Sequence, residues 1–189
     1  MGQRLNLEIR KKGKILANAY YHWSAYTPDS FRLINIAYDY ITRNHHKEDD
    51  VMLAVHALEY TGAGMEDCEL TEVYKQRKYA GVEFKKATDR NEGLLAISEK
   101  GIESTIQWSE ETAIIDITDP KNVKFNFWVV WADDEDYYIE NDKNESDVII
   151  DYDFDPEEDM TYAQLYSYVK DLTDGKVVRY SGRVFREIA

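Results

Sequence analysis

The sequence has little cysteine, proline or glycine, the residues that form disulfides or interrupt regular structure. Its 189 residues include one cysteine, three prolines and nine glycines. Cys68 has no partner for a disulfide within the chain, which argues against a disulfide-rich secreted domain and favours a reducing cytoplasm. No apolar run approaches the roughly 18 residues that a membrane helix needs, and no hydrophobic leader follows Met1. We therefore expect a cytoplasmic protein that contacts no membrane.

The short motifs of common chemistries are also missing. Gly62–Gly64 lacks a third glycine and a preceding predicted strand, which argues against a nucleotide-binding loop. The chain has no G-x-S-x-G elbow and no H-x-x-x-H or C-x-x-C pair. Asp151–Asp155 begins like a calcium loop, but Pro156 stands where glycine is needed and Tyr162 where glutamate is needed. We expect no catalytic residues, no metal and no cofactor, and a binding protein rather than an enzyme.

What the chain does have is a substantial apolar content: 43% of its residues are hydrophobic and 13% are aromatic. This content is enough for one folded domain, and the aromatic residues favour a sheet. We predict a single α+β domain over residues 1–189. It has a largely antiparallel sheet, two N-terminal helices and one C-terminal helix.

The predicted elements follow from periodicity. Alternating apolar residues predict a hairpin over residues 4–26, and a proline start predicts a helix from Pro28 to about Asn44. A second helix begins near Glu48 and stops at Gly62. Thr161 and Gln164 form a capping-box pattern before the C-terminal helix. Further strands are predicted at Leu94–Ser98, Ser104–Trp108, Ala113–Ile117, Lys124–Trp131 (an interior strand), Tyr137–Glu140 and Val148–Asp155, with a closing hairpin through Ser181-Gly182.

The net charge of −14 is concentrated in one segment. Residues 133–159, here the acidic segment, contain fourteen carboxylates and one lysine, a net charge of −13. The rest of the chain has 22 basic and 23 acidic residues, a net charge of −1. Uniform acidity would favour solubility alone, whereas localised acidity indicates a particular surface.

Within the acidic segment, a strand over Val148–Asp155 would place three aspartates on one face. Alternate residues of a strand lie roughly 6.5–7 Å apart, close to the separation of phosphates along a nucleic-acid strand. A protein surface built to hold phosphates would bind such a row. The alternative is a solvated acidic edge that prevents aggregation. The predicted partner-binding residues are Asp133, Asp134, Glu135, Asp136, Asp151, Asp153, Asp155, Glu157 and Glu158.

A second hypothesis is a site for a nucleotide signal. The run Tyr20–Tyr26 is unusually aromatic, and alternate members are expected in the core. The remaining members could stack on a base while a basic cluster holds its phosphates. The predicted ligand-binding residues are Tyr20, His22, Trp23, Lys75, Arg77, Lys78, Lys85, Lys86 and Arg90.

Two stretches carry a resemblance. "GQRLNLEI…ILANAYYHWSAYT" and "DRNEGLLAIS" resemble small uncharacterised accessory proteins of phages and prophages of Gram-positive bacteria. The resemblance implies action against host systems, since inhibitors of CRISPR nucleases and other immune effectors often imitate DNA with clustered acids. The sequence therefore favours an anti-defence inhibitor whose partner is a host protein with a basic nucleic-acid-binding groove, and which itself binds no nucleic acid. An enzyme of unrecognised chemistry is the third alternative, and the oligomeric state stays open.

Overall fold

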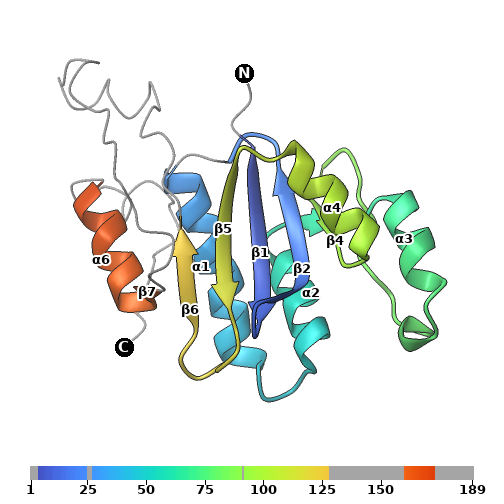
Figure 1. The fold of residues 1–189 in the computed structure, drawn as a ribbon, viewed down its shortest axis with the longest axis horizontal. Coiled ribbons are helices and arrows are strands. Elements are labelled where there is room, and N and C mark those ends of the chain that lie inside the picture. Colours follow the sequence, from blue (N-terminus) through green and yellow to red (C-terminus); the bar gives the residue numbers. More distant parts are fainter. Residues whose placement is uncertain (1–3, 25–26, 91, 128–159, 173–189) are drawn as a thin grey trace.

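A computed structural model describes residues 4–24, 27–90, 92–127 and 160–172. These residues form a mixed sheet of seven strands in the order β3-β4-β2-β1-β5-β6-β7 (Figure 1). Neighbouring strands run antiparallel except for the pairs β1/β5 and β3/β4, which are parallel. The strands are β1 (Leu5–Lys11), β2 (Lys14–Tyr21), β3 (Ala63–Gly64), β4 (Gly93–Ala96), β5 (Glu111–Asp116), β6 (Lys124–Phe127) and β7 (Met160–Thr161).

Helices lie on both faces of this sheet. The helical elements are α1 (Thr27–Asn44), α2 (Asp50–Tyr60), α3 (Asp67–Tyr74), η1 (Arg77–Tyr79, a 3₁₀ turn), α4 (Glu99–Trp108) and α6 (Tyr162–Leu172). In Figure 1, α1 and α2 lie behind the central strands, whereas α4 lies in front of β2 and β4. The predicted α+β class is confirmed.

The alternation of β1 explains how its two faces differ. Leu5, Leu7 and Ile9 are fully buried on the face that α1 and α2 cover, within the main apolar core. The residues between them are polar and point to the other face, where Asn6 and Glu8 are nevertheless buried. The sheet therefore has one apolar face and one face that buries polar groups.

The hairpin, the first two helices and the C-terminal helix lie where the sequence predicts them. Lys12 and Gly13 form the hairpin turn with positive φ angles of 52° and 74°. Asp49 caps α2 through the amides of Val51 and Met52. The predicted capping box is present at the start of α6, because the Thr161 amide donates to Gln164 Oε1 at 2.8 Å and the Gln164 amide donates to Thr161 Oγ1 at 3.3 Å.

One predicted strand is wrong. Residues 104–108 belong to helix α4 and not to a strand. The Ser98 hydroxyl accepts a hydrogen bond from the Gly101 amide and so caps the helix, which makes the Lys100-Gly101 pair part of its first turn rather than a hairpin turn. Helix α3, in a region where we predict no regular element, also forms.

The predicted interior position of β6 is confirmed for the described part, since β6 pairs with both β5 and β7 and Phe125 is fully buried. The rest of the Lys124–Trp131 prediction lies outside the described residues. So do the predicted strands at Tyr137–Glu140 and Val148–Asp155 and the closing hairpin.

Candidate functional site

The acidic segment lies outside the described residues, but the strands on either side of it are adjacent. Phe125 of β6 pairs with Met160 of β7, and Lys124 pairs with Thr161. The two strands that flank the acidic segment in the sequence are therefore neighbours at one edge of the sheet. All nine predicted partner-binding residues lie in this connection: Asp133, Asp134, Glu135, Asp136, Asp151, Asp153, Asp155, Glu157 and Glu158.

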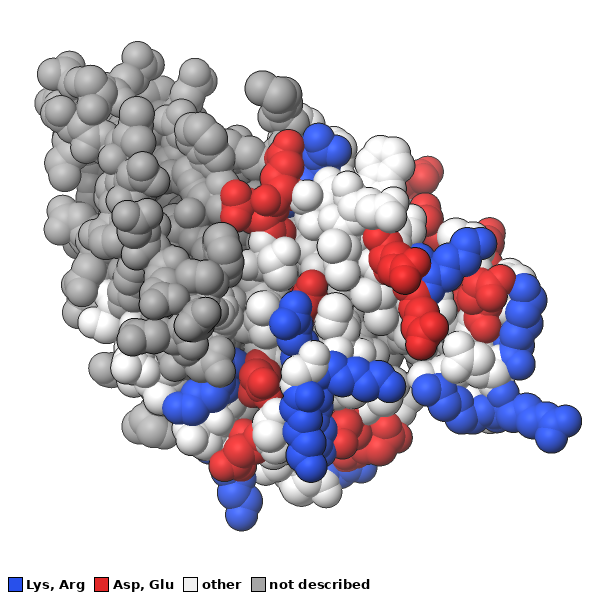
Figure 2. All heavy atoms as spheres, viewed as in Figure 1, with Lys and Arg blue, Asp and Glu red and all other residues white. Residues whose placement is uncertain are grey.

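On the face that Figure 2 shows, the described surface does not separate charge by sign. Figure 2 shows acidic and basic side chains intermingled over the described part of this face. Several of them form ion pairs, such as Arg4–Glu110 at 3.2 Å and Lys11–Asp50 at 2.6 Å. The mixed surface agrees with the net charge of −1 outside the acidic segment.

The aromatic run lies at the end of β2. The hydroxyl of Tyr20 is 3.0 Å from His22 Nδ1, and the rings of His22 and Trp23 meet edge to face with centroids 4.9 Å apart. Trp23 is 58% exposed, while Tyr21 is fully buried and its hydroxyl is 2.6 Å from Thr61 Oγ1. Tyr21 is thus a core residue and Tyr20 is half-buried, whereas His22 and Trp23 are exposed. The expected alternation does not reach Trp23, because β2 ends at Tyr21.

Several members of the predicted basic cluster have partners of their own. Lys75 pairs with Glu72 at 2.7 Å and Lys86 pairs with Asp67 at 2.7 Å. Lys85 Nζ donates to the Glu59 carbonyl at 3.4 Å, and Arg77 and Arg90 are exposed. The Lys78 ammonium lies 4.5 Å from the centre of the Tyr79 ring, in a cation–π contact.

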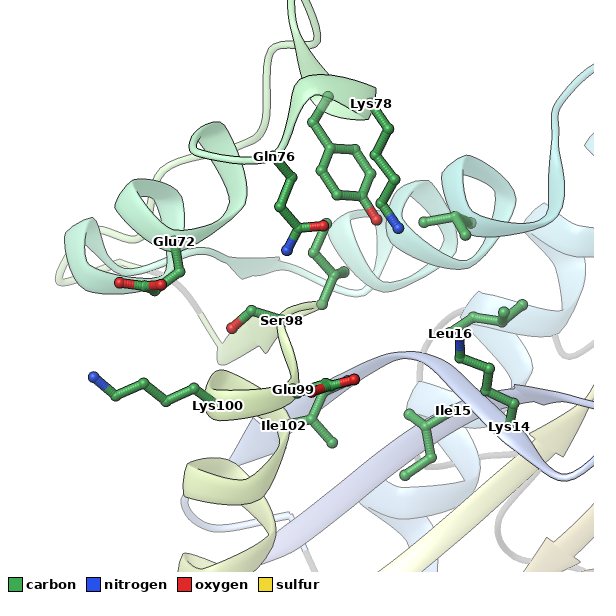
Figure 3. Close-up of a pocket in the computed structure, with 13 residues that line it drawn as sticks. Lys14, Ile15, Leu16, Glu72, Gln76, Lys78, Ser98, Glu99, Lys100 and Ile102 are labelled. Atoms are coloured by element: carbon green, nitrogen blue, oxygen red, sulfur yellow. The ribbon is translucent and has the colours of Figure 1, made fainter.

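A hollow of about 510 Å³ opens between the start of β2, η1 and the start of α4 (Figure 3). Of the nine residues in the nucleotide hypothesis, Lys78 lines this hollow and the aromatic run does not. Lys14, Gln76 and Lys100 line it as well. Sequence reasoning missed these three residues. The position of Lys100, for example, depends on α4, which replaces a predicted strand. For Lys14, the predicted hairpin turn over Lys11–Lys14 is the sequence feature that could have indicated its position at the start of β2.

A buried carboxylate joins α3 to the start of α4. Glu69 is 5% exposed, and its Oε1 accepts hydrogen bonds from the amides of Ile97 and Ser98, both at 2.7 Å. Its Oε2 accepts from the Ser98 hydroxyl at 2.6 Å. A carboxylate is favourable at a helix N-terminus, where amide dipoles point outward. This helix end is therefore already occupied by the protein's own anion.

A second buried carboxylate lies on the polar face of the sheet. Glu8 accepts hydrogen bonds from Asn6 Nδ2 at 2.8 Å and from Arg10 Nε at 2.5 Å. Burial raises the pKa of Glu8, and the charge of Arg10 opposes that shift. Asn18 Nδ2 extends the network by donating to Asn6 Oδ1 at 2.9 Å and to Thr105 Oγ1 at 2.7 Å. The network ties β1, β2 and α4 together.

Glu111 is a third carboxylate, and its surroundings disfavour the charged form. Strand alternation puts it on the apolar face of β5 with Ala113 and Ile115, next to Leu5 of β1. Burial, with a smaller contribution from the charge of Glu110, raises its pKa to about 7.

We expect Glu111→Gln to stabilise the protein at pH 8 and not at pH 4. Because the folded-state pKa of Glu111 lies above its unfolded value, its contribution to stability is lost as pH rises from 4.5 to about 7. Allowing for solvent screening, the gain at pH 8 is about 1–2 kcal/mol in the free energy of unfolding. Urea unfolding at both pH values measures it, with Glu103→Gln on exposed α4 surface as control. An equal gain at pH 4 would contradict the assignment.

The described residues contain no cluster of three or more histidine, cysteine, aspartate or glutamate side chains that could hold a metal ion. Within the same residues, no helix combines the length and apolar character that crossing a membrane requires.

Comparisons with models of protein families, with curated proteins and with solved structures gave no match to this chain. The chemistry of its own residues is therefore what bears on its function.

Proposed function

We propose that this protein binds a nucleic-acid-binding protein through the acidic segment and blocks its basic groove. The observation that carries the proposal is the charge separation, with −13 of the net −14 in residues 133–159. Such a segment attracts clustered lysine and arginine over longer distances than a mixed surface does. A proposed setting is an anti-defence role in a host cytoplasm, in keeping with the resemblance to phage accessory proteins.

The described fold supports this proposal by the place of the two strands that flank the acidic segment in the sequence. Both ends of the connection attach to paired strands, β6 and β7, at one edge of the sheet (Figure 1). Tyr162, which follows β7, packs on helix α1. Its ring stacks on Tyr38 with centroids 4.6 Å apart, and its hydroxyl donates to Asn35 at 2.6 Å. A connection anchored at both ends presents its charges with less loss of chain entropy on binding than a free tail.

Binding would displace nucleic acid because both ligands need the same cations. Carboxylates at alternate strand positions would meet lysine and arginine side chains that otherwise hold phosphates. The protein itself, being acidic, would be repelled by nucleic acid. We assign no catalytic step to this mode of action.

The experiment is a competition pull-down from a Gram-positive bacterial lysate with two variants. The test variant carries Asp151→Asn, Asp153→Asn and Asp155→Asn, which removes three charges with little change in shape. The matched control carries Glu83→Gln, Asp89→Asn and Glu103→Gln, three exposed carboxylates outside the segment. Both variants are checked for an unchanged melting temperature.

We expect the wild type and the control to retain the same proteins, which salt elutes and duplex DNA displaces, and the test variant to lose them. Retention of the same proteins by the test variant, or retained proteins that DNA does not displace, would contradict the proposal. Direct binding of DNA by the wild type would contradict it as well.

A further inference from the structure

We propose that the hollow beside η1 binds a phosphate monoester that carries hydroxyl groups, such as a sugar phosphate or a mononucleotide. This site is separate from the acidic segment and does not depend on the function proposed for it. Its volume of about 510 Å³ is in the range of small-molecule sites, which run from about 300 to 1,000 Å³.

The walls of the hollow bring three elements together. Figure 3 shows Gln76 pointing from the η1 side toward Ser98 at the start of α4, and Lys78 pointing from the same side toward Leu16 of β2. The first residues of β2 lie on the third side. The turn at Gly13 (φ 74°) places Lys14 there, at the first position of the strand.

The charges of the hollow favour an anion. Among the residues that the structure describes, Lys14 and Lys78 form no ion pair, and the Lys78 ammonium is held over the Tyr79 ring. Glu72 is compensated, because Lys75 lies 2.7 Å from it and Lys100 also lowers its pKa. With Glu72 paired to Lys75, the lining keeps Lys14, Lys78 and Lys100 against one carboxylate, Glu99. The resulting charge of +2 matches the two negative charges of a phosphate monoester.

The helix end does not supply the anion site by itself. The amides of Ile97 and Ser98, just before α4, already donate to the Glu69 carboxylate, and the Gly101 amide donates to the Ser98 hydroxyl. The lysines would hold the phosphate as point charges, a role that lysine fills in other phosphate sites. Among the described residues that line the hollow, none is an arginine.

The other residues of the hollow suit the part of the ligand that the phosphate is attached to. The exposed Glu99 carboxylate accepts hydrogen bonds only, and so suits hydroxyl groups of a sugar. Gln76 offers both a donor and an acceptor. Leu16, Val51 and Ile102 are half-buried and give an apolar surface for a carbon skeleton or a base.

The test is calorimetric titration and thermal unfolding with four probes: ribose 5-phosphate, adenosine 5′-monophosphate, inorganic phosphate and adenosine. We expect both phosphate esters to bind and to raise the melting temperature, since a ligand that binds only the folded state stabilises it. Adenosine should not bind, and inorganic phosphate should bind more weakly than the esters. Equal binding of adenosine, or no binding of either ester at millimolar concentration, would overturn the proposal.

Variants then locate the site. Lys14→Gln with Lys78→Gln should weaken ester binding by about tenfold or more, because two charge-assisted hydrogen bonds are lost. Lys47→Gln with Lys121→Gln removes two exposed lysines elsewhere and should leave the affinity unchanged. Lys14→Arg with Lys78→Arg keeps the charge and should retain most of the binding. Equal weakening by the distant pair would overturn the assignment, and unfolding curves without ligand show that every variant folds.

Discussion

Replacing Gly101 with alanine is expected to destabilise the protein by about 2–3 kcal/mol, although glycine to alanine in an ordinary helix is stabilising by about 1 kcal/mol. A Cβ at this position would overlap Oε2 of Glu69 and lie 2.7 Å from its Cδ. Glu69 cannot simply move aside, because three hydrogen bonds hold its carboxylate at the start of α4. The clash therefore disrupts a buried polar contact.

The cost of the same substitution should fall sharply when Glu69 is absent. Glu69→Ala alone destabilises the protein, since the buried amides of Ile97 and Ser98 lose their acceptor. With that carboxylate gone, the remaining close contact of the new Cβ is Ala96 Cβ at 3.0 Å, so Gly101→Ala should cost much less than in the wild type. Urea unfolding of the two single variants and the double variant gives the coupling, which we expect to be about 3 kcal/mol. Additive effects would show that Glu69 does not hold α4 in this way.

Removal of Arg10 should have the other large effect. Glu8 is 2% exposed, and Arg10 supplies its positive partner. Breaking a buried pair on one side leaves an uncompensated charge, so Arg10→Ala should cost about 3 kcal/mol at pH 8. The variant with both Glu8→Gln and Arg10→Ala should lose much less, because no charge is left buried.

The pH dependence separates this explanation from lost packing. Without Arg10, the pKa of Glu8 should rise further, and protonation then relieves the buried charge. The destabilisation by Arg10→Ala should therefore be smaller at pH 5 than at pH 8 in urea unfolding. A loss of equal size at both pH values would indicate that only packing had been removed.

Elements with strong local signals could be predicted from the sequence. The hairpin has strict alternation around Gly13, and α6 has the Thr161–Gln164 capping box before its apolar stripe. These signals are local in the sequence, and the structure that they favour is the one that tertiary packing also favours. Helix α1 is a similar case, because it begins at the predicted proline start.

Helix α4 could not be predicted in the same way. Its glycine at position 101 suggests a turn, and its stability depends on Glu69, which lies 32 positions earlier in the chain and on another helix. The parallel pairing of β1 with β5 joins residues over 100 positions apart and leaves no local signal. The hollow is formed by α4 and η1, neither of which the sequence predicts. For this reason, Lys78 is the one described residue of its lining that is also among the predicted ligand-binding residues.

The most direct test of the acidic segment is the association rate constant of wild-type protein with a captured partner, measured at several salt concentrations. Attraction between exposed charges is screened within roughly 8 Å at physiological ionic strength, so the rate constant should fall steeply as salt rises. The variant with Asp151→Asn, Asp153→Asn and Asp155→Asn should associate about tenfold more slowly at low salt and depend less on salt. A variant that associates as fast as the wild type at every salt concentration would leave the acidic segment as solvated surface.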